Sequence, residues 1–90
     1  MKEIDIERKL VNKIKLKSGL CLKFVSPSFT GVPDRIVLMP NGIIYFVETK
    51  APGGKPRPRQ AYVHKQLRNL GFKVIVIDSL DNLNSFLNEI

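Results

Sequence analysis

Hydrophobic residues recur along the first part of the chain with the period of an α-helix. We predict a helix over residues 3–17, because its apolar positions form one stripe and lysines cover much of the remaining surface. The stripe consists of Ile4, Leu10, Val11 and Ile14. Glu7 lies one turn from two of these residues, so it is an acid that points toward the core side. Ser18-Gly19 ends the pattern, with Gly19 as the expected C-cap.

The middle of the chain has short apolar runs separated by turn residues, which predicts β-strands. Strands are expected at Cys21–Val25, Arg35–Met39 and Ile43–Thr49. Residues 26–33 are rich in Ser, Pro and Gly and predict a loop. The strand Ile43–Thr49 is apolar on both faces, so we expect it at the centre of a sheet with helices on each side.

The turn between the last two of these strands decides which residues face each other. Pro40-Asn41-Gly42 suits a three-residue loop with Pro at the first position of a type I turn and Gly in the left-handed conformation. In that register Asp34 is opposite Glu48. A two-residue Asn-Gly turn would instead oppose Asp34 to Thr49, and would put Pro40 in a ladder position that needs an N–H donor. We therefore predict the three-residue turn.

The last part of the chain predicts a helix, a strand and a second helix. The helix is expected from Arg59 to Leu70, after the Pro/Gly-rich basic loop Ala51–Pro58. Its expected core face consists of Val63, Leu67 and Leu70. The strand Phe72–Ile77 is nearly all apolar and should run parallel to the central strand, through a right-handed crossover. Ser79 is the expected N-cap of a short final helix, whose inward residues would be Leu80, Leu83, Phe86 and Leu87.

These elements predict an α/β sandwich around a mixed sheet, in one domain over residues 1–90. Hydrophobic residues make up 43% of the chain, which is enough for a folded core, and 15 basic against 8 acidic side chains give a net charge of +7. This charge favours a polyanionic partner. We expect no membrane span and no signal peptide, and the single cysteine, Cys21, suits a buried thiol in a reducing cytoplasm of a bacterium or phage host.

The strand ends carry the residues with the clearest chemistry. Period-2 geometry puts Glu48 and Lys50 on one face, about 7 Å apart along the strand. The hairpin register adds Asp34 as a cross-strand neighbour, and two adjacent carboxylates repel each other unless a cation offsets their charge. Two carboxylates, water and a substrate phosphate make a sufficient Mg²⁺ site. The alternative is an ordinary ion pair at an exposed hairpin end.

The order of these motifs resembles the PD-(D/E)XK nuclease superfamily, and within it the VRR-NUC family of small phage-type and DNA-repair nucleases. The resemblance runs from Glu7 to about Ile77. It rests on Glu7 in the first helix, Gly31-Val32-Pro33-Asp34, Glu48-Thr49-Lys50-Ala51-Pro52, and Gln60 at the start of the next helix. The family implies a restriction-endonuclease-like αβββαβ core, with a mixed sheet flanked by helices; here a short C-terminal helix would follow.

The resemblance also implies roles for individual residues. Asp34, Glu48 and the backbone carbonyl of Thr49 would bind Mg²⁺ or Mn²⁺, and Glu7 would complete the metal site directly or through water. Lys50 would orient the nucleophilic water. Gln60 would contact Lys50, the water or a phosphate, whereas without the resemblance a polar residue of a first helical turn is the preferred interpretation.

Two positions depart from the family pattern. Arg35 follows Asp34 where an apolar residue is usual, and alternation puts it on one face with Val37 and Met39. Thr49 stands where a small apolar residue is common. Neither departure removes a catalytic group.

Several further polar residues are candidates for DNA contact. On the loop beside the predicted metal site these are Lys55, Arg57 and Arg59, with Ser28 and Thr30 near Asp34. His64, one helical turn beyond Gln60, is a candidate for a backbone phosphate, and a solvated or locally bonded histidine is the alternative. Tyr62 suits packing better than base stacking.

The leading hypothesis is a metal-dependent endonuclease that hydrolyses DNA phosphodiester bonds. By family analogy it would act on branched DNA such as four-way junctions, as a homodimer whose two sites cut opposing strands. The main alternative is a non-catalytic basic DNA- or RNA-binding module on a nuclease fold. RNA binding independent of metal is disfavoured, because the paired aromatics of a stacking sheet face are absent. Membrane-surface binding by the first helix is disfavoured because that helix has few bulky apolar anchors.

Overall fold

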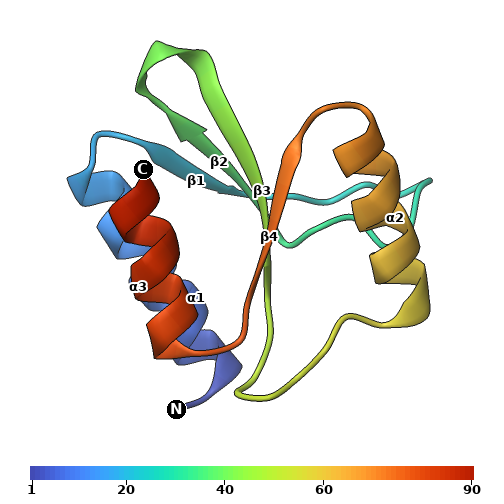
Figure 1. The fold of residues 1–90 in the computed structure, drawn as a ribbon, viewed down its shortest axis with the longest axis horizontal. Helices are drawn as coiled ribbons and strands as arrows, with labels where there is room; N and C mark the ends of the chain where they lie inside the picture. The colour runs from blue at the N-terminus through green and yellow to red at the C-terminus, as the bar shows by residue number, and fades with distance from the viewer.

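The computed structural model describes residues 1–90 as a four-stranded mixed sheet with helices on both faces (Figure 1). In chain order the elements are α1 (Glu3–Leu16), β1 (Leu20–Lys23), β2 (Arg35–Met39), the short 3₁₀ turn η1 (Pro40–Gly42), β3 (Ile43–Thr49), α2 (Pro58–Asn69), β4 (Lys73–Ile77) and α3 (Leu80–Glu89). The predicted fold, a mixed α/β sandwich of order αβββαβ with a C-terminal helix, is confirmed.

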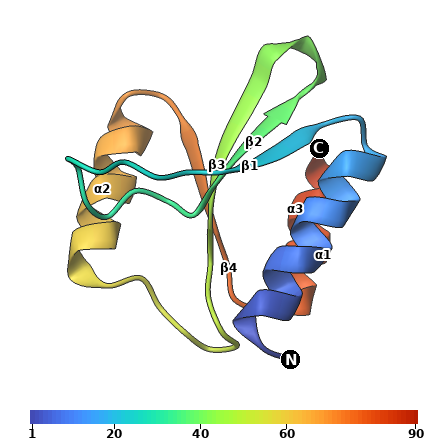
Figure 2. The ribbon, with the colours of Figure 1, turned by 180° about the vertical axis from the view of Figure 1, so that it is seen from behind.

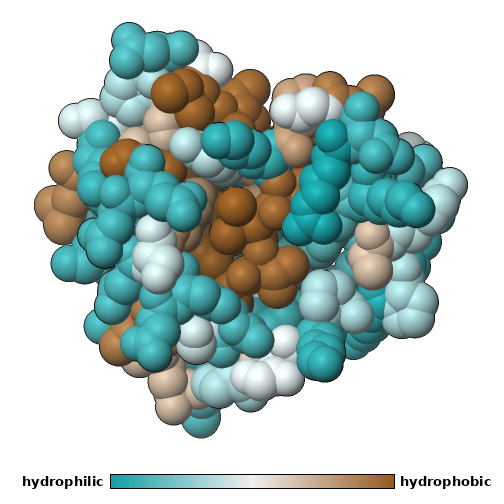
Figure 3. All heavy atoms as spheres, viewed as in Figure 1, coloured by the Kyte–Doolittle hydropathy of each residue, from teal (hydrophilic) through white to brown (hydrophobic).

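The strands lie in the order β1-β2-β3-β4. The first three form an antiparallel meander, and β4 joins β3 in parallel through helix α2, as the predicted crossover requires. Strand β3 therefore lies between β2 and β4, at the interior position predicted from its two apolar faces. Both β1 and β4 are edge strands. On the molecular surface seen in Figure 3, which has the view of Figure 1, hydrophobic atoms gather at the centre and hydrophilic atoms lie on both sides.

Helices α1 and α3 lie side by side on one face of the sheet, and α2 lies on the other (Figures 1 and 2). The main core lies between the sheet and the first pair of helices. Its buried residues are Ile6, Leu10 and Ile14 of α1, Val37, Val47 and Ile77 of the sheet, and Leu83, Phe86 and Leu87 of α3. Two consequences follow for the site: side chains that alternate along a strand face different helices, and only α2 covers the second face.

In each helix, one residue that was predicted to face the core is exposed instead. In α1 the buried residues are Ile6, Leu10 and Ile14, while Ile4 is 58% exposed. Leu70, which follows α2 as its C-cap, is 73% exposed, and Leu80 at the start of α3 is 41% exposed, so neither belongs to the core. The prediction included these residues because sequence periodicity does not distinguish an apolar residue at the edge of the buried helix face from one at its centre. None of the three helices is long and apolar enough to cross a membrane.

Helix α1 ends differently from the prediction. Ser18, not Gly19, has the left-handed backbone (φ +65°), and the Gly19 N–H donates to the Ile14 carbonyl at 3.0 Å, as in a Schellman motif. Gly19 is required for space, because a Cβ there would lie 2.6 Å from Met39 Sδ and 2.8 Å from the Leu38 carbonyl oxygen. The glycine therefore lets the end of α1 pack closely on the β2 strand.

The β2–β3 hairpin has the predicted three-residue loop and register. Met39 pairs with Ile43, and the ladder continues to Arg35 opposite Val47. The predicted type I turn is wrong, because Asn41 (φ +70°) as well as Gly42 (φ +75°) is left-handed. Asparagine tolerates this conformation better than other residues with a side chain. Loop length, rather than turn type, determines the register, so the strand ends still align as expected.

Cys21 is half-buried and packs against the main core. Burial raises the pKa of its thiol to about 11, which disfavours the reactive thiolate. Cys21 is therefore less buried than predicted, although it contacts the core as a structural residue would.

Candidate active site

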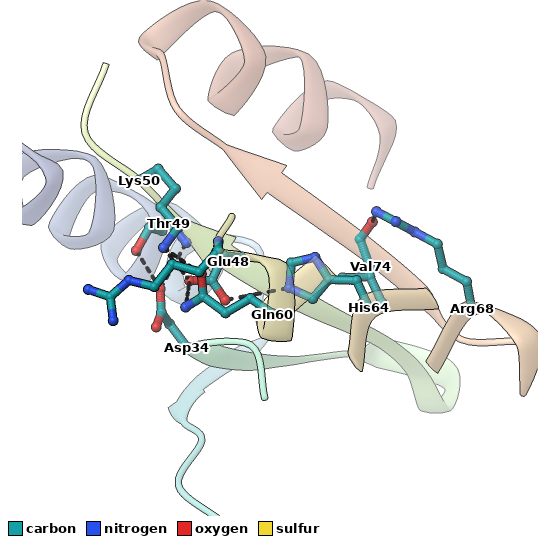
Figure 4. Close-up of polar contacts among 9 residues, drawn as sticks. Asp34, Glu48, Thr49, Lys50, Gln60, His64, Arg68 and Val74 are labelled. Carbon is teal, nitrogen blue, oxygen red and sulfur yellow. Dashed lines mark hydrogen bonds and ion pairs between the residues drawn. The ribbon is translucent and has the colours of Figure 1, made fainter. Parts of the chain in front are cut away.

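Polar side chains gather where β2 begins, where β3 ends and where α2 starts. The residues in this cluster are Asp34, Glu48, Thr49, Lys50, Gln60 and His64 (Figure 4). The hairpin register and period-2 alternation put Asp34 and Glu48 on the α2 face of the sheet. Helix α2 closes over that end of the face, so three segments far apart in sequence meet in one polar cluster.

Asp34 is held by the end of the neighbouring strand. Its Oδ2 accepts the Thr49 backbone N–H at 3.0 Å and the Thr49 hydroxyl at 3.1 Å. The Asp34 carbonyl accepts the Phe24 N–H at 2.9 Å, which extends the β1–β2 ladder by one step. Both hydrogen bonds from Thr49 reach the same oxygen and therefore fix the orientation of the carboxylate. The side chain of Thr49, for which no role was predicted, thus positions Asp34.

The loop before Asp34 is packed against helix α2. Gly31 has φ +90°, and a Cβ there would lie 2.9 Å from Arg59 Cγ and 3.1 Å from Val63 Cγ2. Arg59 Nε donates to the Thr30 carbonyl at 3.1 Å, and the Arg59 guanidinium lies 4.9 Å from the centre of the Phe29 ring. The glycine of the Gly-Val-Pro-Asp motif is therefore needed for both backbone conformation and close approach, and it fixes where the acid enters the cluster.

Glu48 is a buried carboxylate, with 1% of the residue exposed. Its Oε2 accepts Gln60 Nε2 at 3.2 Å and lies 3.3 Å from Lys50 Nζ, as predicted from their shared strand face. Burial, and secondly the charge of Asp34, raises the pKa of Glu48 to about 7, although Lys50 opposes this shift. The surroundings of Glu48 therefore disfavour the ionised form of its carboxylate.

Gln60 connects the lysine to the helix. Its Oε1 accepts Lys50 Nζ at 2.9 Å and the Arg57 backbone N–H at 2.8 Å, the second being the reach-back bond of a helix capping box. The predicted contact with Lys50 and the predicted position at the start of the helix are both observed, because one amide caps α2 and contacts Lys50 and Glu48. The start of the helix and the end of β3 are held together by this residue.

The structure does not bring Glu7 into this cluster. Its Oε2 accepts Arg35 Nε at 2.7 Å, and the two side chains are 22% and 18% exposed. Arg35 shares a face with Val37, which belongs to the α1–α3 core, whereas Asp34 is directed to the α2 side. The two unusual residues of the sequence, an acid on a core stripe and an arginine after the aspartate, therefore pair with each other.

His64 is not a surface residue, so the prediction that it contacts a DNA phosphate is wrong. It is 2% exposed, and its Nε2 lies 3.5 Å from Glu48 Oε1. Burial, followed by the charges of Arg68 and Lys50, lowers the pKa of its imidazole. The sequence contained a signal for this position: His64 follows Gln60 by four residues, and residues at that spacing share a helix face.

The other predicted DNA-contact residues surround the cluster without joining it. Ser28, Thr30, Lys55 and Arg57 are exposed. Arg59 is also exposed, but its guanidinium stacks near the Phe29 ring and near the Tyr62 ring, at 5.4 Å from the centre of the latter. Tyr62 is 53% exposed, so it packs less than predicted. The basic residues among them, Lys55, Arg57 and Arg59, thus lie on the surface around the buried carboxylates.

The donor set of the cluster fits a hard divalent cation. No group of three His, Cys, Asp or Glu side chains gathers as a ready metal cage. The two carboxylates of Asp34 and Glu48 nevertheless share one small region, and Glu48 retains its proton to about pH 7 in the absence of a compensating charge. Oxygen ligands of this kind, completed by water, suit Mg²⁺, which usually binds one or two protein carboxylates.

Comparison with known proteins agrees with this geometry. No protein-family model matches the sequence. The chain is 52% identical over 87 residues to "Putative nuclease p44" of Acyrthosiphon pisum secondary endosymbiont phage 1, a match covering 97% of this chain and 92% of that protein. A solved structure described as a VRR_NUC domain matches with a TM-score of 0.91 and 29% identity, over 98% of this chain and 96% of that one. The chain therefore belongs to the VRR-NUC family of nucleases.

Proposed function

We propose that this protein is an Mg²⁺- or Mn²⁺-dependent endonuclease that hydrolyses phosphodiester bonds in DNA. The observation that carries the proposal is the group of Glu48, Lys50 and Gln60, joined by hydrogen bonds and an ion pair, with Asp34 held beside them by Thr49, in a chain of a nuclease family. A buried carboxylate with a raised pKa beside a second acid and a lysine is typical of a catalytic site rather than of a solvated hairpin end.

Asp34 and Glu48 would hold the metal, with the backbone carbonyl of Thr49 as a further ligand. When bound, the cation would polarise a phosphoryl oxygen and lower the pKa of a bound water. Thr49 holds one oxygen of Asp34 through two hydrogen bonds, so the carboxylate is oriented before any ligand arrives. Because Glu7 pairs with Arg35 on the other face of the sheet, the proposal includes Glu7 only as a ligand through water.

Lys50 would act on the attacking water. Its Nζ lies 2.9 Å from Gln60 Oε1 and 3.3 Å from Glu48 Oε2, so two fixed acceptors determine its position. A lysine ammonium held in this way can orient a water molecule through a hydrogen bond and offset negative charge as the phosphorane forms. Gln60 would serve as a positioning residue, because it holds Lys50 and caps α2 at the same time.

The proposed substrate is branched DNA, such as a four-way junction. The net charge of +7 favours a nucleic acid, and the exposed side chains of Lys55 and Arg57 precede helix α2 next to the cluster. The fold has no separate element that could enter a DNA groove and read bases. We therefore propose recognition of DNA shape, with Ser28 and Thr30 as further phosphate contacts.

The proposed assembly is a homodimer, in which two sites act on opposing strands. Part of the α2 face of the sheet carries exposed apolar side chains, and a second copy would cover them. They include Leu20 (59% exposed), Leu22 (45%) and Ile44 (39%), which share a face by strand pairing. Sedimentation tests this: Leu22→Glu should convert a dimer of the wild type into monomers, and a monomeric wild type at micromolar concentration refutes the assembly.

Cleavage of matched substrates tests the activity. Four-way junction, flap, single-stranded and duplex DNA are incubated with Mg²⁺, Mn²⁺ or EDTA. Lys50→Met keeps most of the length of the side chain and removes its charge, and Lys15→Met makes the same change at an exposed position of α1. We expect metal-dependent cutting of the junction that Lys50→Met abolishes and Lys15→Met retains.

The other outcomes separate the parts of the proposal. Cleavage of another substrate but not of the junction would support nuclease activity and refute the proposed selectivity for junctions. Binding of DNA without cutting under every metal condition would reject catalysis and leave a non-catalytic basic DNA- or RNA-binding module on a nuclease fold. Cleavage that continues in EDTA would refute the proposed dependence on a divalent metal ion.

A further inference from the structure

Two buried polar atoms face each other at the back of the cluster without a conventional hydrogen bond. His64 Nε2 and Glu48 Oε1 are 3.5 Å apart, and neither has another hydrogen-bond partner (Figure 4). The two residues are 2% and 1% exposed, so solvent does not satisfy them. An unpaired buried polar group costs about 1–3 kcal/mol, and more when it is charged. Their mutual approach is the one contact that removes both penalties.

The distance is close to that of a hydrogen bond. An N–H···O bond spans about 2.7–3.2 Å, so a shift of about half an ångström would form it. Hydrogen bonds in a catalytic site often tighten when the ligand is bound. The imidazole is on α2 four residues after Gln60, which contacts the other oxygen of the same carboxylate.

The two oxygens of Glu48 thus have separate surroundings. Oε1 faces His64 in the interior, and Oε2 faces Lys50 and Gln60 on the polar side of the cluster. A carboxylate has a single plane, so a donor on one oxygen fixes the direction of the other. An apolar residue of similar size at position 64 would fill the space but would leave Oε1 without any donor.

We infer that His64 is a positioning residue: its Nε2–H donates to Oε1 of the ionised Glu48 and holds the carboxylate so that Oε2 is presented to the metal. This inference rests on the proposed function, because Glu48 is assigned there as a metal ligand. This arrangement is the reverse of the common one, in which a histidine binds the metal and a carboxylate supports the histidine. His64 touches neither metal nor substrate.

The tautomer of the imidazole ring follows from the carboxylate oxygen that it faces. A neutral imidazole carries one N–H and must choose which nitrogen bears it. Ionised Glu48 favours the proton on Nε2, because that tautomer alone gives the carboxylate a donor.

The ring tautomer of the wild-type protein tests the inference without any substitution. His64 is the single histidine of the chain, so nitrogen NMR of the imidazole needs no assignment by mutation. At pH 8 with saturating Mg²⁺ we expect a protonated Nε2 and an unprotonated Nδ1. A ring protonated on Nδ1 alone would overturn the inference, whatever the variants show.

Two variants test the consequence for metal binding. His64→Gln keeps an amide N–H at the same number of bonds from Cα as Nε2, whereas His64→Phe keeps a ring and removes the donor. Mn²⁺ affinity is measured by electron paramagnetic resonance, and thermal unfolding confirms that each variant is folded. We expect His64→Phe to weaken Mn²⁺ binding about 10- to 100-fold, and His64→Gln to stay within about threefold of the wild type.

The outcomes distinguish this inference from the proposed function. Wild-type affinity in a folded His64→Phe would overturn the positioning role and leave the metal site intact. Equal weakening in both variants would also overturn it, because the retained donor would then have no effect. Failure of the wild type itself to bind Mn²⁺ would instead overturn the proposed metal site. If His64→Phe does not fold, the tautomer measurement decides.

Discussion

Replacing Glu48 with glutamine should stabilise the metal-free protein above pH 7, although it removes a proposed metal ligand. Glu48 is 1% exposed, and burial with the charge of Asp34 raises its pKa from an ordinary 4.5 to about 7. At 1.36 kcal/mol for each pKa unit, this difference corresponds to about 3 kcal/mol of destabilisation once the carboxylate is ionised. Glutamine has nearly the same shape and never ionises.

The direction of the pH dependence follows from the same numbers. The pKa of Glu48 is higher in the folded protein, so the folded state holds this proton more tightly than the unfolded chain does. The resulting stability is fully present below about pH 4.5 and is lost as the pH rises through about 7. In Glu48→Gln this loss is absent. Its amide can donate to the His64 ring nitrogen, and its oxygen can still accept from Lys50 and Gln60.

Thermal and urea unfolding in EDTA between pH 4 and 8 measure the effect. At pH 8 we expect Glu48→Gln to have a free energy of unfolding up to about 3 kcal/mol above that of the wild type, or a Tm higher by on the order of 10 °C. Glu89→Gln makes the same chemical change at an exposed position and should leave the curve unchanged. Saturating Mg²⁺ should stabilise the wild type and not Glu48→Gln.

One result would refute the reasoning. If wild type and Glu48→Gln unfold at the same Tm at pH 8 in EDTA, with the same pH slope, Glu48 is not under electrostatic stress. A cation bound at this position would then have no electrostatic stress to relieve.

Three further changes test the supports of the cluster. Thr49→Val should lower the free energy of unfolding by about 1–3 kcal/mol and weaken Mn²⁺ binding, because the Asp34 carboxylate loses its hydroxyl donor, whereas Thr49→Ser should retain both properties. Gly31→Ala should lower the free energy of unfolding by about 1–3 kcal/mol more than Gly53→Ala, because both glycines have positive φ but only the first would meet neighbouring atoms; equal losses in urea unfolding would contradict this. Glu7→Gln should lower the free energy of unfolding by about 1–3 kcal/mol through loss of its ion pair, and should lower kcat far less than replacing Lys50, the proposed catalytic lysine. A loss of cleavage as large as that of the lysine variant would show that Glu7 binds the metal directly.

The order of the helices and strands, and the positions of Asp34, Glu48 and Lys50 in the site, follow from local sequence patterns. The loop Pro40–Gly42 fixed the hairpin register through its length and the missing N–H of proline, so the strand ends carrying Asp34 and Glu48 could be aligned from sequence. Strand alternation placed Lys50 beside Glu48, as observed at 3.3 Å. These relations depend on residues close in sequence or joined by one short turn, and for that reason they could be predicted.

Packing of distant segments decided the rest. Whether Glu7 faced the proposed metal site or Arg35 depended on which sheet face α1 covers, and whether His64 faced solvent or Glu48 depended on how far α2 is rotated. Helix α2 has few apolar residues, so periodicity alone did not distinguish an inward His64 from an inward Leu70. A sequence pattern gives the faces of each element, but the partner of each face is chosen when all elements bury their apolar surface together.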